Sequence, residues 1–206
     1  FEYCSSESTG GRPLGATTNR GRLVEILAVL DGLPVQIDSL NTYPGVEEAQ
    51  EDGATFAENA RAKATHYSHH TGQIAVADDS GLEIDALGGA PGVRSARFNG
   101  TSYPEKFATI QRSLNANRAA GSTARFVCSL AVADDHRIVF EATGVIEGQI
   151  AQKPKGTNGF GYDPIFFYPP CGRTLAEVSP AEKTAVSHRG QAFRALRTYL
   201  ETQLRL

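Results

Sequence analysis

The sequence predicts a mixed α/β fold, in which helices and strands intermix and at least one pair of strands is antiparallel. Segments with helical spacing of apolar residues alternate with short apolar runs that have strand character. Two of these runs, residues 125–133 and 137–146, are joined by the polar turn Asp134-Asp135-His136, which predicts an antiparallel hairpin. No repeat, low-complexity tract or clear linker divides the 206 residues, so we expect one domain over residues 1–206.

In the first half of the chain, the first helix is predicted over residues 20–30, where apolar side chains recur at helical spacing. A strand is expected over residues 35–40. The run Thr55-Phe56-Ala57-Glu58 matches a capping box and predicts a helix from there to about His70, before Gly72. Residues 74–76 then form a short apolar run that predicts a buried strand.

The second half continues the same pattern. A second capping box at residues 102–105 opens a predicted helix, and a third at residues 179–182 opens another. Residues 153–163 form a loop rich in Gly and Lys, which leads into a short strand over residues 165–168. A last helix is predicted from Gln191 to about Leu204, with its apolar side chains at helical spacing.

Composition excludes several classes of function. A formal net charge of -3 provides neither the basic surface of a nucleic-acid-binding protein nor a polybasic membrane patch. No apolar run approaches the roughly 20 residues that a membrane span needs. Three widely separated cysteines lack metal-binding spacing, so we expect a soluble, cytoplasmic protein. Residues 1–15 are polar and glycine-rich and are expected to form a loose or atypical N-terminal segment.

The adjacent pair Asp78-Asp79, at the predicted end of a strand, is the strongest candidate for chemistry. Successive side chains of a strand point in different directions, so one carboxylate is expected to face a cleft while the other hydrogen-bonds the turn. Like charges this close raise each other's pKa, and Mg²⁺ beside a substrate phosphate would supply the missing positive charge. An aspartate-rich turn before Gly81 is the structural alternative.

Two further clusters are candidates for chemistry, and the first of them suits a polyphosphate. Residues 16–22 (ATTNRGR) lead into the first predicted helix, whose exposed amides and two arginines would bind phosphates. Ordinary capping by Thr18 or Asn19 is the alternative. Glu58, with Asn59 and Lys63, lies in the first turns of the next helix, where the glutamate of a capping box already has a structural task.

Two other clusters suit a base and its neighbouring groups. In residues 156–164 (GTNGFGYDP), Phe160 stands between two glycines, where it is poor core material and a good surface for stacking. Lys183 and the run Ser187-His188-Arg189-Gly190 lie where one predicted helix ends and the last begins. The histidine and arginine either satisfy helix carbonyls or donate to a ligand. Together with the aspartate pair, these clusters describe a nucleoside triphosphate site.

At these positions the chain resembles the inosine triphosphate pyrophosphatase family (Ham1/RdgB-like), whose members hydrolyse ITP, dITP and XTP to the monophosphate and pyrophosphate. The resemblance implies an elongated mixed β-sheet flanked by helices, with a central nucleotide-binding cleft. It also implies a homodimer and Mg²⁺ as cofactor. The shared runs occur in family order, at residues 17–22, 55–60, 77–81, 88–92, 95–98, 159–164 and 182–192.

The resemblance further implies a role for each matching residue. Asp79 would hold Mg²⁺ and orient or deprotonate the attacking water, with Glu58 helping at the metal. Ser80 would touch the substrate. The remaining substrate-binding residues implied are Thr17, Thr18, Asn19, Arg20, Gly21, Arg22 and Lys183 for the triphosphate, Phe160, Gly161, Tyr162 and Asp163 for the base and ribose, and His188 and Arg189 for the purine.

The first loop departs from the family pattern. A polar segment replaces the usual apolar first strand, Thr18 stands where glycine is usual, and Arg22 stands where lysine is usual. A Cβ at Thr18 would crowd a phosphate if the backbone needs a positive φ, and Arg22 keeps the charge without the point geometry of lysine. These changes bear on phosphate affinity and not on the class of reaction.

Two other functions compete with this one. A Maf-like pyrophosphatase would act on pyrimidine or modified nucleotides, and His188 with Arg189 argues against it. A nucleotide-binding sensor without turnover would need no corner for activating water, so the intact carboxylates Glu58, Asp78 and Asp79 argue against that function.

Overall fold

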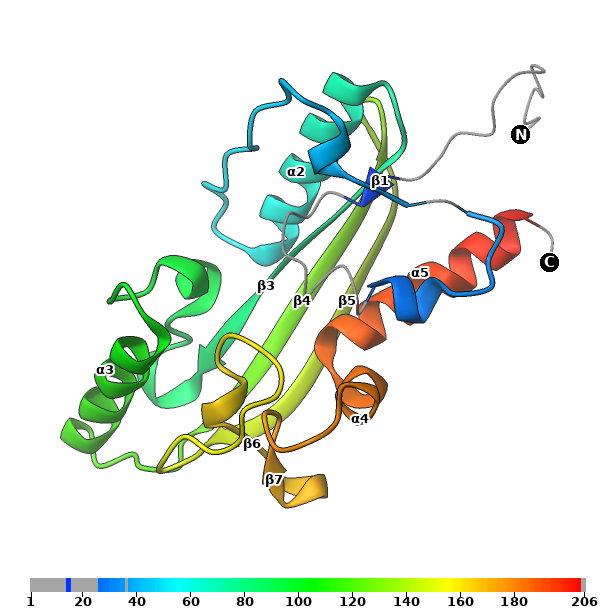
Figure 1. The fold of residues 1–206 in the computed structure, drawn as a ribbon. Helices are drawn as coiled ribbons and strands as arrows, with labels where there is room; N and C mark the ends of the chain where they lie inside the picture. The colour runs from blue at the N-terminus through cyan, green and yellow to red at the C-terminus, as the bar shows by residue number, and fades with distance from the viewer. Residues whose placement is uncertain (1–13, 16–25, 36, 205–206) are drawn as a thin grey trace.

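The strands of the protein form one sheet with helices on both sides (Figure 1). The structure, a computed structural model, describes residues 14–15, 26–35 and 37–204. Within these residues seven strands are ordered β2-β1-β3-β4-β5-β6-β7. β1 (Leu14–Gly15) pairs in parallel with β2 (Asp38–Ser39) and with β3 (Ala75–Ile84), whereas every pair from β3 onward is antiparallel. The predicted mixed sheet flanked by helices is therefore confirmed.

Three long strands make the centre of the sheet: β3, β4 (Thr123–Asp134) and β5 (Arg137–Ile150). β4 and β5 form the predicted hairpin, and β3 pairs with β4 along its whole length. The prediction that the strand ends at the two aspartates is wrong, because the ladder with β4 continues through them to Ile84. Ser80 and Gly81 suggest a turn from local sequence alone, and the long-range pairing overrides that preference.

The shorter strands and the first helix agree with the prediction in part. β6 (Phe166–Tyr168) and β7 (Arg173–Thr174) extend the far edge of the sheet. The strand expected over residues 35–40 is only the two residues of β2, and a 3₁₀ turn at Leu40–Thr42 follows it. Residues 26–30 are helical, and the start of the helix predicted there lies outside the described residues.

Capping boxes open three helices, as the sequence predicts. They are α2 (Phe56–Thr71), α3 (Tyr103–Ala116) and α4 (Pro180–Val186). α2 ends at Gly72, whose φ of 65° lies in the left-handed region that glycine adopts without strain. α5 (His188–Leu204) begins earlier than the predicted Gln191, directly after α4. No helix of the described residues is long and apolar enough to span a membrane.

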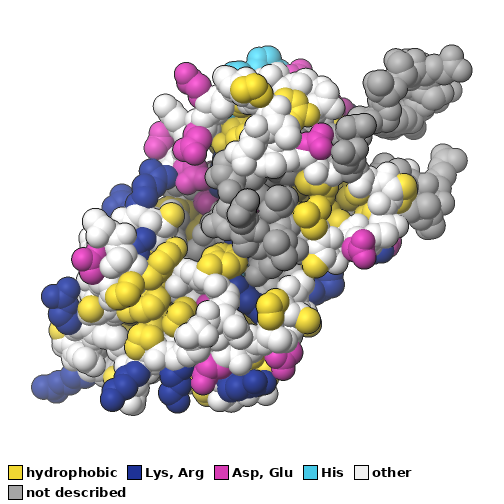
Figure 2. Space-filling model, in the orientation of Figure 1, with side chains coloured by type: hydrophobic (Ala, Val, Ile, Leu, Met, Phe, Trp, Pro, Cys, Tyr) yellow, Lys and Arg dark blue, Asp and Glu magenta, His cyan; other side chains and the backbone are white. Residues whose placement is uncertain are grey.

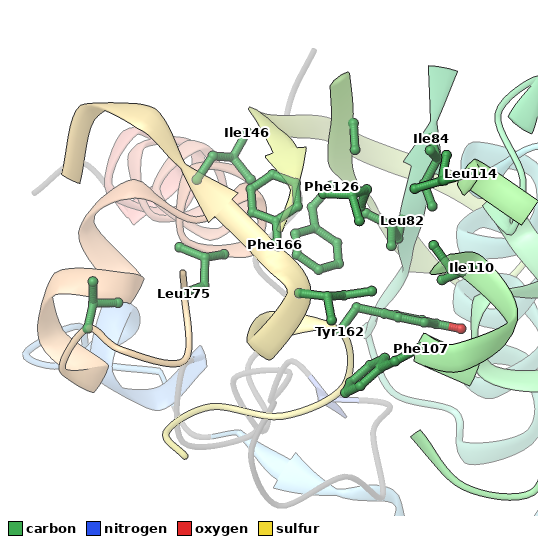
Figure 3. Packing of buried hydrophobic residues seen from close by; sticks show 14 residues of the cluster. Leu82, Ile84, Phe107, Ile110, Leu114, Phe126, Ile146, Tyr162, Phe166 and Leu175 are labelled. Atoms are coloured by element: carbon green, nitrogen blue, oxygen red, sulfur yellow. The ribbon is translucent and has the colours of Figure 1, made fainter. Parts of the chain in front are cut away.

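The core divides between the two faces of the central strands. On one face Leu82 and Ile84 of β3 pack with Phe126 and Phe166 (Figure 3), and α5 covers the part of this face nearer the start of β3. On the other face α2 packs through small side chains, among them Ala60, against alanines of β3 and β4. Because α2 and α5 lie on opposite faces, side chains of β3 meet different helices in alternation (Figure 1).

Candidate active site

Asp78 points from β3 toward α5, where it forms a buried ion pair with Arg189. Asp78 Oδ2 accepts hydrogen bonds from Arg189 Nη2 at 3.3 Å and Nε at 3.4 Å. The same Nη2 donates to Ser80 Oγ at 2.7 Å, and both charged side chains are almost fully buried. The expectation that one aspartate hydrogen-bonds a turn is wrong, because the strand does not turn here. The expectation that the two aspartates diverge is confirmed.

Asp79 points to the opposite face, where two side chains of α2 hold its carboxylate. Asn59 Nδ2 donates to Asp79 Oδ2 at 2.9 Å, and Lys63 Nζ lies 3.3 Å from Asp79 Oδ1. Asn59 and Lys63 are four residues apart and so share one face of the helix. Asn59 Oδ1 accepts the amide hydrogen of Gly53 at 2.8 Å, which fixes which side of the Asn59 amide faces Asp79.

A second carboxylate, that of Glu51, lies close to Asp79, and we call this group of side chains the Asp79 corner. Lys63 Nζ also donates to Glu51 Oε1 at 2.8 Å, so one buried ammonium bridges Glu51 and Asp79. Burial raises the pKa of Asp79, and Lys63 and Asn59 offset that effect only in part. Burial alone would lower the pKa of Lys63, but Asp79, Asp78 and Glu51 outweigh it and the pKa is raised.

Glu51 is a site residue that the sequence reasoning missed. Its other oxygen lies 3.2 Å from Arg97 Nη2, and its pKa is lowered because Lys63 and Arg97 outweigh the effect of burial. Glu51 stands in a loop with three other acidic residues between positions 47 and 52, and loops carry no period that would single one of them out. Its contacts with Lys63 and Arg97, which only the folded chain shows, distinguish it.

Glu58, the metal ligand named from the family resemblance, is exposed and occupied in a cap. Its Oε2 accepts the amide hydrogens of Ala54 at 2.7 Å and Thr55 at 3.3 Å, which completes the capping box of α2. The structural task expected of Glu58 is thus confirmed. Its role at a metal stays a prediction.

A pocket on the α5 face of β3 gathers most of the other predicted residues. The loop before β6 is organised around the buried Asp163, whose Oδ2 accepts the amide hydrogen of Phe160 at 2.8 Å and Lys183 Nζ at 2.6 Å. Gly159 and Gly161, on either side of Phe160, both have a φ in the left-handed region. The predicted residues that line the pocket are Ser80, Phe160, Gly161, Tyr162, Asp163, Lys183, His188 and Arg189.

Aromatic and cationic groups face each other in this pocket. The ring centroid of Phe160 lies 4.1 Å from Lys183 Nζ and 5.5 Å from Arg189 Cζ. His188 stacks on Phe126, with ring centroids 4.9 Å apart and an interplanar angle of 12°. An aromatic ring flanked by cations suits a ligand that joins a flat base to a phosphate.

Tyr162 has a different place from its neighbours in the loop. Its ring is buried in the core beside Phe107 (Figure 3), and its hydroxyl donates to the backbone oxygen of Ser95 at 2.8 Å. Burial raises the pKa of Tyr162, so the hydroxyl keeps its proton for this bond. The hydroxyl of Tyr162 therefore holds the segment around Ser95 in place, and its proton is used in that bond to the backbone.

The pocket and the Asp79 corner lie on opposite faces of β3, and the edge of that strand lies between them. Within the described part of the chain, β1 pairs with β3 at Ala75 and Val76, and one isolated bridge joins Glu83 to Pro91 farther along. A ligand that crosses the edge between these contacts reaches both faces. The predicted residues Thr17, Thr18, Asn19, Arg20, Gly21 and Arg22 lie outside the described residues.

Comparisons with known proteins point to one family. Residues 14–199 match the sequence profile of the Ham1 family. The chain is 47% identical over 184 residues to a dITP/XTP pyrophosphatase of an Exiguobacterium species, with 88% of this chain and 92% of that protein covered. It is 44% identical over 190 residues to a dITP/XTP pyrophosphatase of Geobacter sulfurreducens, with 91% and 96% covered.

Solved structures agree with the sequence comparison. A HAM1 protein from Coxiella burnetii superposes with a TM-score of 0.88 at 39% identity, and the match covers 94% of this chain and 100% of that one. The Ham1 protein of Staphylococcus aureus superposes with a TM-score of 0.82 at 30% identity, and the match covers 93% and 100%.

Proposed function

The chain belongs to the Ham1 family, and from that premise we propose how its site works. The protein is a hydrolase that converts deaminated purine nucleoside triphosphates (ITP, dITP and XTP) to the monophosphate and pyrophosphate. The relatives are named for dITP and XTP. The observation that supports this function most directly is the pair of carboxylates, Asp79 and Glu51, that Lys63 bridges on the α2 face of β3.

We propose that Asp79 and Glu51 hold Mg²⁺. Carboxylate oxygens are the ligands that Mg²⁺ prefers beside substrate phosphates. The donor set also fits on electrostatic grounds, since the raised pKa of Asp79 means that burial leaves its negative charge incompletely compensated. When bound, Mg²⁺ would neutralise charge on the phosphate oxygens. The Glu58 carboxylate is engaged in its cap, so we place Glu58 second to Glu51 as a ligand.

Asp79 is proposed to prepare the attacking water. Its carboxylate is held from two sides, by Asn59 at 2.9 Å and Lys63 at 3.3 Å, so its position is set before substrate arrives. A carboxylate within reach of the water can accept its proton and so act as a general base. The proton taken from water would go to an oxygen of Asp79. The water oxygen would bond to the α-phosphorus while the bond from that phosphorus to the α–β bridging oxygen breaks, and pyrophosphate would leave with that oxygen.

The triphosphate is proposed to lie between residues 17–22 and Lys183. Gly15, directly before that segment, pairs with Val76, two residues before Asp78, so the segment starts beside the strand that carries the carboxylates. The base would stack on Phe160. The ammonium of Lys183 lies over this ring, so it would be near a phosphate attached to the nucleoside.

We propose that His188 and Arg189 select hypoxanthine and xanthine over adenine. The purine 6-oxo group accepts a hydrogen bond, whereas the 6-amino group of adenine donates one and would meet a donor. Arg189 is fixed by Asp78 and Ser80 and cannot swing away to accommodate the wrong group. A site built around such hydrogen bonds can reject the wrong group by roughly 10⁴-fold.

The test of the reaction is pyrophosphate release from ITP, dITP, XTP, GTP and ATP, with Mg²⁺ and with EDTA. We expect release from the first three substrates, little from ATP, and loss of activity in EDTA. Preferential release from pyrimidine nucleotides would support the Maf-like alternative. Tight ITP binding without release would support the sensor.

The test of base selection is the ratio of kcat/KM for ITP to that for ATP in His188→Ala. We expect this ratio to fall at least about 10-fold, because the variant lacks a donor that only ITP can use. Equal losses on both nucleotides would mean that His188 holds the fold or the phosphates and does not read the base.

We also propose that the protein is a homodimer, as its family resemblance implies. Light scattering coupled to gel filtration should then give twice the mass of one chain. A mass equal to that of one chain at micromolar concentration would contradict this.

A further inference from the structure

Histidines gather at one end of the molecule, away from the site described above. The chain has five. Four of them, His66, His69, His70 and His136, contact one another through their rings at the C-terminal end of α2 and the β4–β5 turn. Figure 2 shows histidine side chains at the top of the molecule, above α2. The Ham1 reaction as proposed uses none of these four.

Two of these histidines and the neighbouring Asp135 hold their potential ligand atoms close together. His69 Nδ1 lies 3.0 Å from Asp135 Oδ1, and His136 Nε2 lies 3.7 Å from the same oxygen. All three ligand atoms lie within 4.8 Å of one another. Metal ligands around one ion at bond lengths near 2.0–2.2 Å are separated by distances of this order. Small rotations of exposed side chains would bring them onto one ion.

The backbone that carries these ligands is tied down. The amide of Asp135 donates to Ser68 Oγ at 2.7 Å, and this hydroxyl donates to the backbone oxygen of Gln73 at 2.6 Å. Ser68 is buried, so the β4–β5 turn is anchored to the end of α2. Asp135 has a φ of 54°, a conformation uncommon outside glycine, and it is held there next to the helix.

We propose that His69, Asp135 and His136 bind a divalent transition-metal ion of the zinc class, at a site separate from the Mg²⁺ site. Two imidazoles and one carboxylate suit Zn²⁺, Ni²⁺ or Cu²⁺, whereas Mg²⁺ prefers oxygen ligands alone. Three protein ligands leave a position for water. The bound ion joins the end of α2 to the β4–β5 turn, so it stabilises the packing of the helix that holds Asp79 at its other end.

The test measures Zn²⁺ binding to the chain without a polyhistidine tag, by competition with a chromophoric chelator in excess Mg²⁺. We expect one Zn²⁺ per chain. We expect His69→Ala and His136→Ala each to weaken binding at least about 10-fold, since even groups that only support a ligand contribute 10–100-fold. His66→Ala is the matched control, one turn earlier on α2, and its Nε2 contacts the Glu47 backbone oxygen. It should bind as the parent does.

Two further measurements keep the result unambiguous. Zn²⁺ should raise the melting temperature of the parent and of Asp79→Asn, and leave that of His136→Ala unchanged. The proposal is overturned by absence of stoichiometric binding, by equal loss in His66→Ala, or by loss of Zn²⁺ binding in Asp79→Asn. The last result would place the ion at the catalytic carboxylates.

Discussion

Replacing each of the two adjacent aspartates by asparagine should separate stability from catalysis. Asp78→Asn removes the charged partner of Arg189, whose side chain is 2% exposed, and leaves a buried cation without its carboxylate. Breaking a buried pair in this way costs about 3–5 kcal/mol. The asparagine oxygen still accepts a hydrogen bond, so we expect the free energy of unfolding to fall by about 3 kcal/mol, the lower end of this range. For a chain of this size that is roughly 6–12 °C in melting temperature.

Asp79→Asn should remove catalysis and leave stability nearly unchanged. Burial raises the pKa of Asp79, so the folded protein binds this proton more tightly than the unfolded chain. The Asp79 carboxyl therefore lowers the free energy of unfolding as the pH rises from the ordinary carboxyl pKa through the raised pKa of the folded protein. Asparagine does not ionise, so the variant is free of this loss. Lys63 keeps Glu51 as a partner. We expect a free energy of unfolding at neutral pH within about 1 kcal/mol of the parent or above it.

The assays are urea unfolding at about pH 7 and about pH 5, and pyrophosphate release from ITP. Asp79→Asn should lose at least about 100-fold in kcat, because it lacks the carboxylate that we propose prepares the water. Its stability relative to the parent should decline as the pH falls, since protonation removes the same penalty from the parent. The reasoning is refuted if Asp79→Asn is destabilised as much as Asp78→Asn, or if it keeps turnover within a few-fold of the parent.

Three other variants test single contacts. Glu51→Gln should raise the Mg²⁺ concentration for half-maximal rate at least about 10-fold. Glu58→Gln, which preserves the cap, should leave that concentration within a few-fold of the parent's. A Mg²⁺ titration measures both, and a larger increase in Glu58→Gln than in Glu51→Gln would make Glu58 the metal ligand. Gly81→Ala places a Cβ 2.6 Å from the Gly92 backbone oxygen and should lower the free energy of unfolding by about 1–3 kcal/mol in urea. Phe160→Ala should raise KM for ITP by about 10–100-fold if the base stacks there, and an unchanged KM would place the base elsewhere.

Local signals in the sequence determined where α2, α3 and α4 begin and which residues are candidates for chemistry. The capping boxes at Thr55, Ser102 and Ser179 depend on residues three positions apart, so the sequence alone predicts them. The same holds for the β4–β5 turn, where a short polar run separates two strand-like segments. Family-like runs placed Ser80, the loop around Phe160 and the start of α5 in one site, and the structure brings them into one pocket.

Only the tertiary structure decided what the two aspartates do. Asp78 finds Arg189, 111 residues away along the chain, and Asp79 finds α2 on the other face. Which partner each carboxylate meets depends on which helix covers which face of β3, and no local pattern encodes that. Glu51 likewise became recognisable only through the ammonium of Lys63. Pairing across the sheet also carried β3 past the residues that locally suggest a turn, because hydrogen bonds to β4 outweigh the weak strand preference of Ser80 and Gly81.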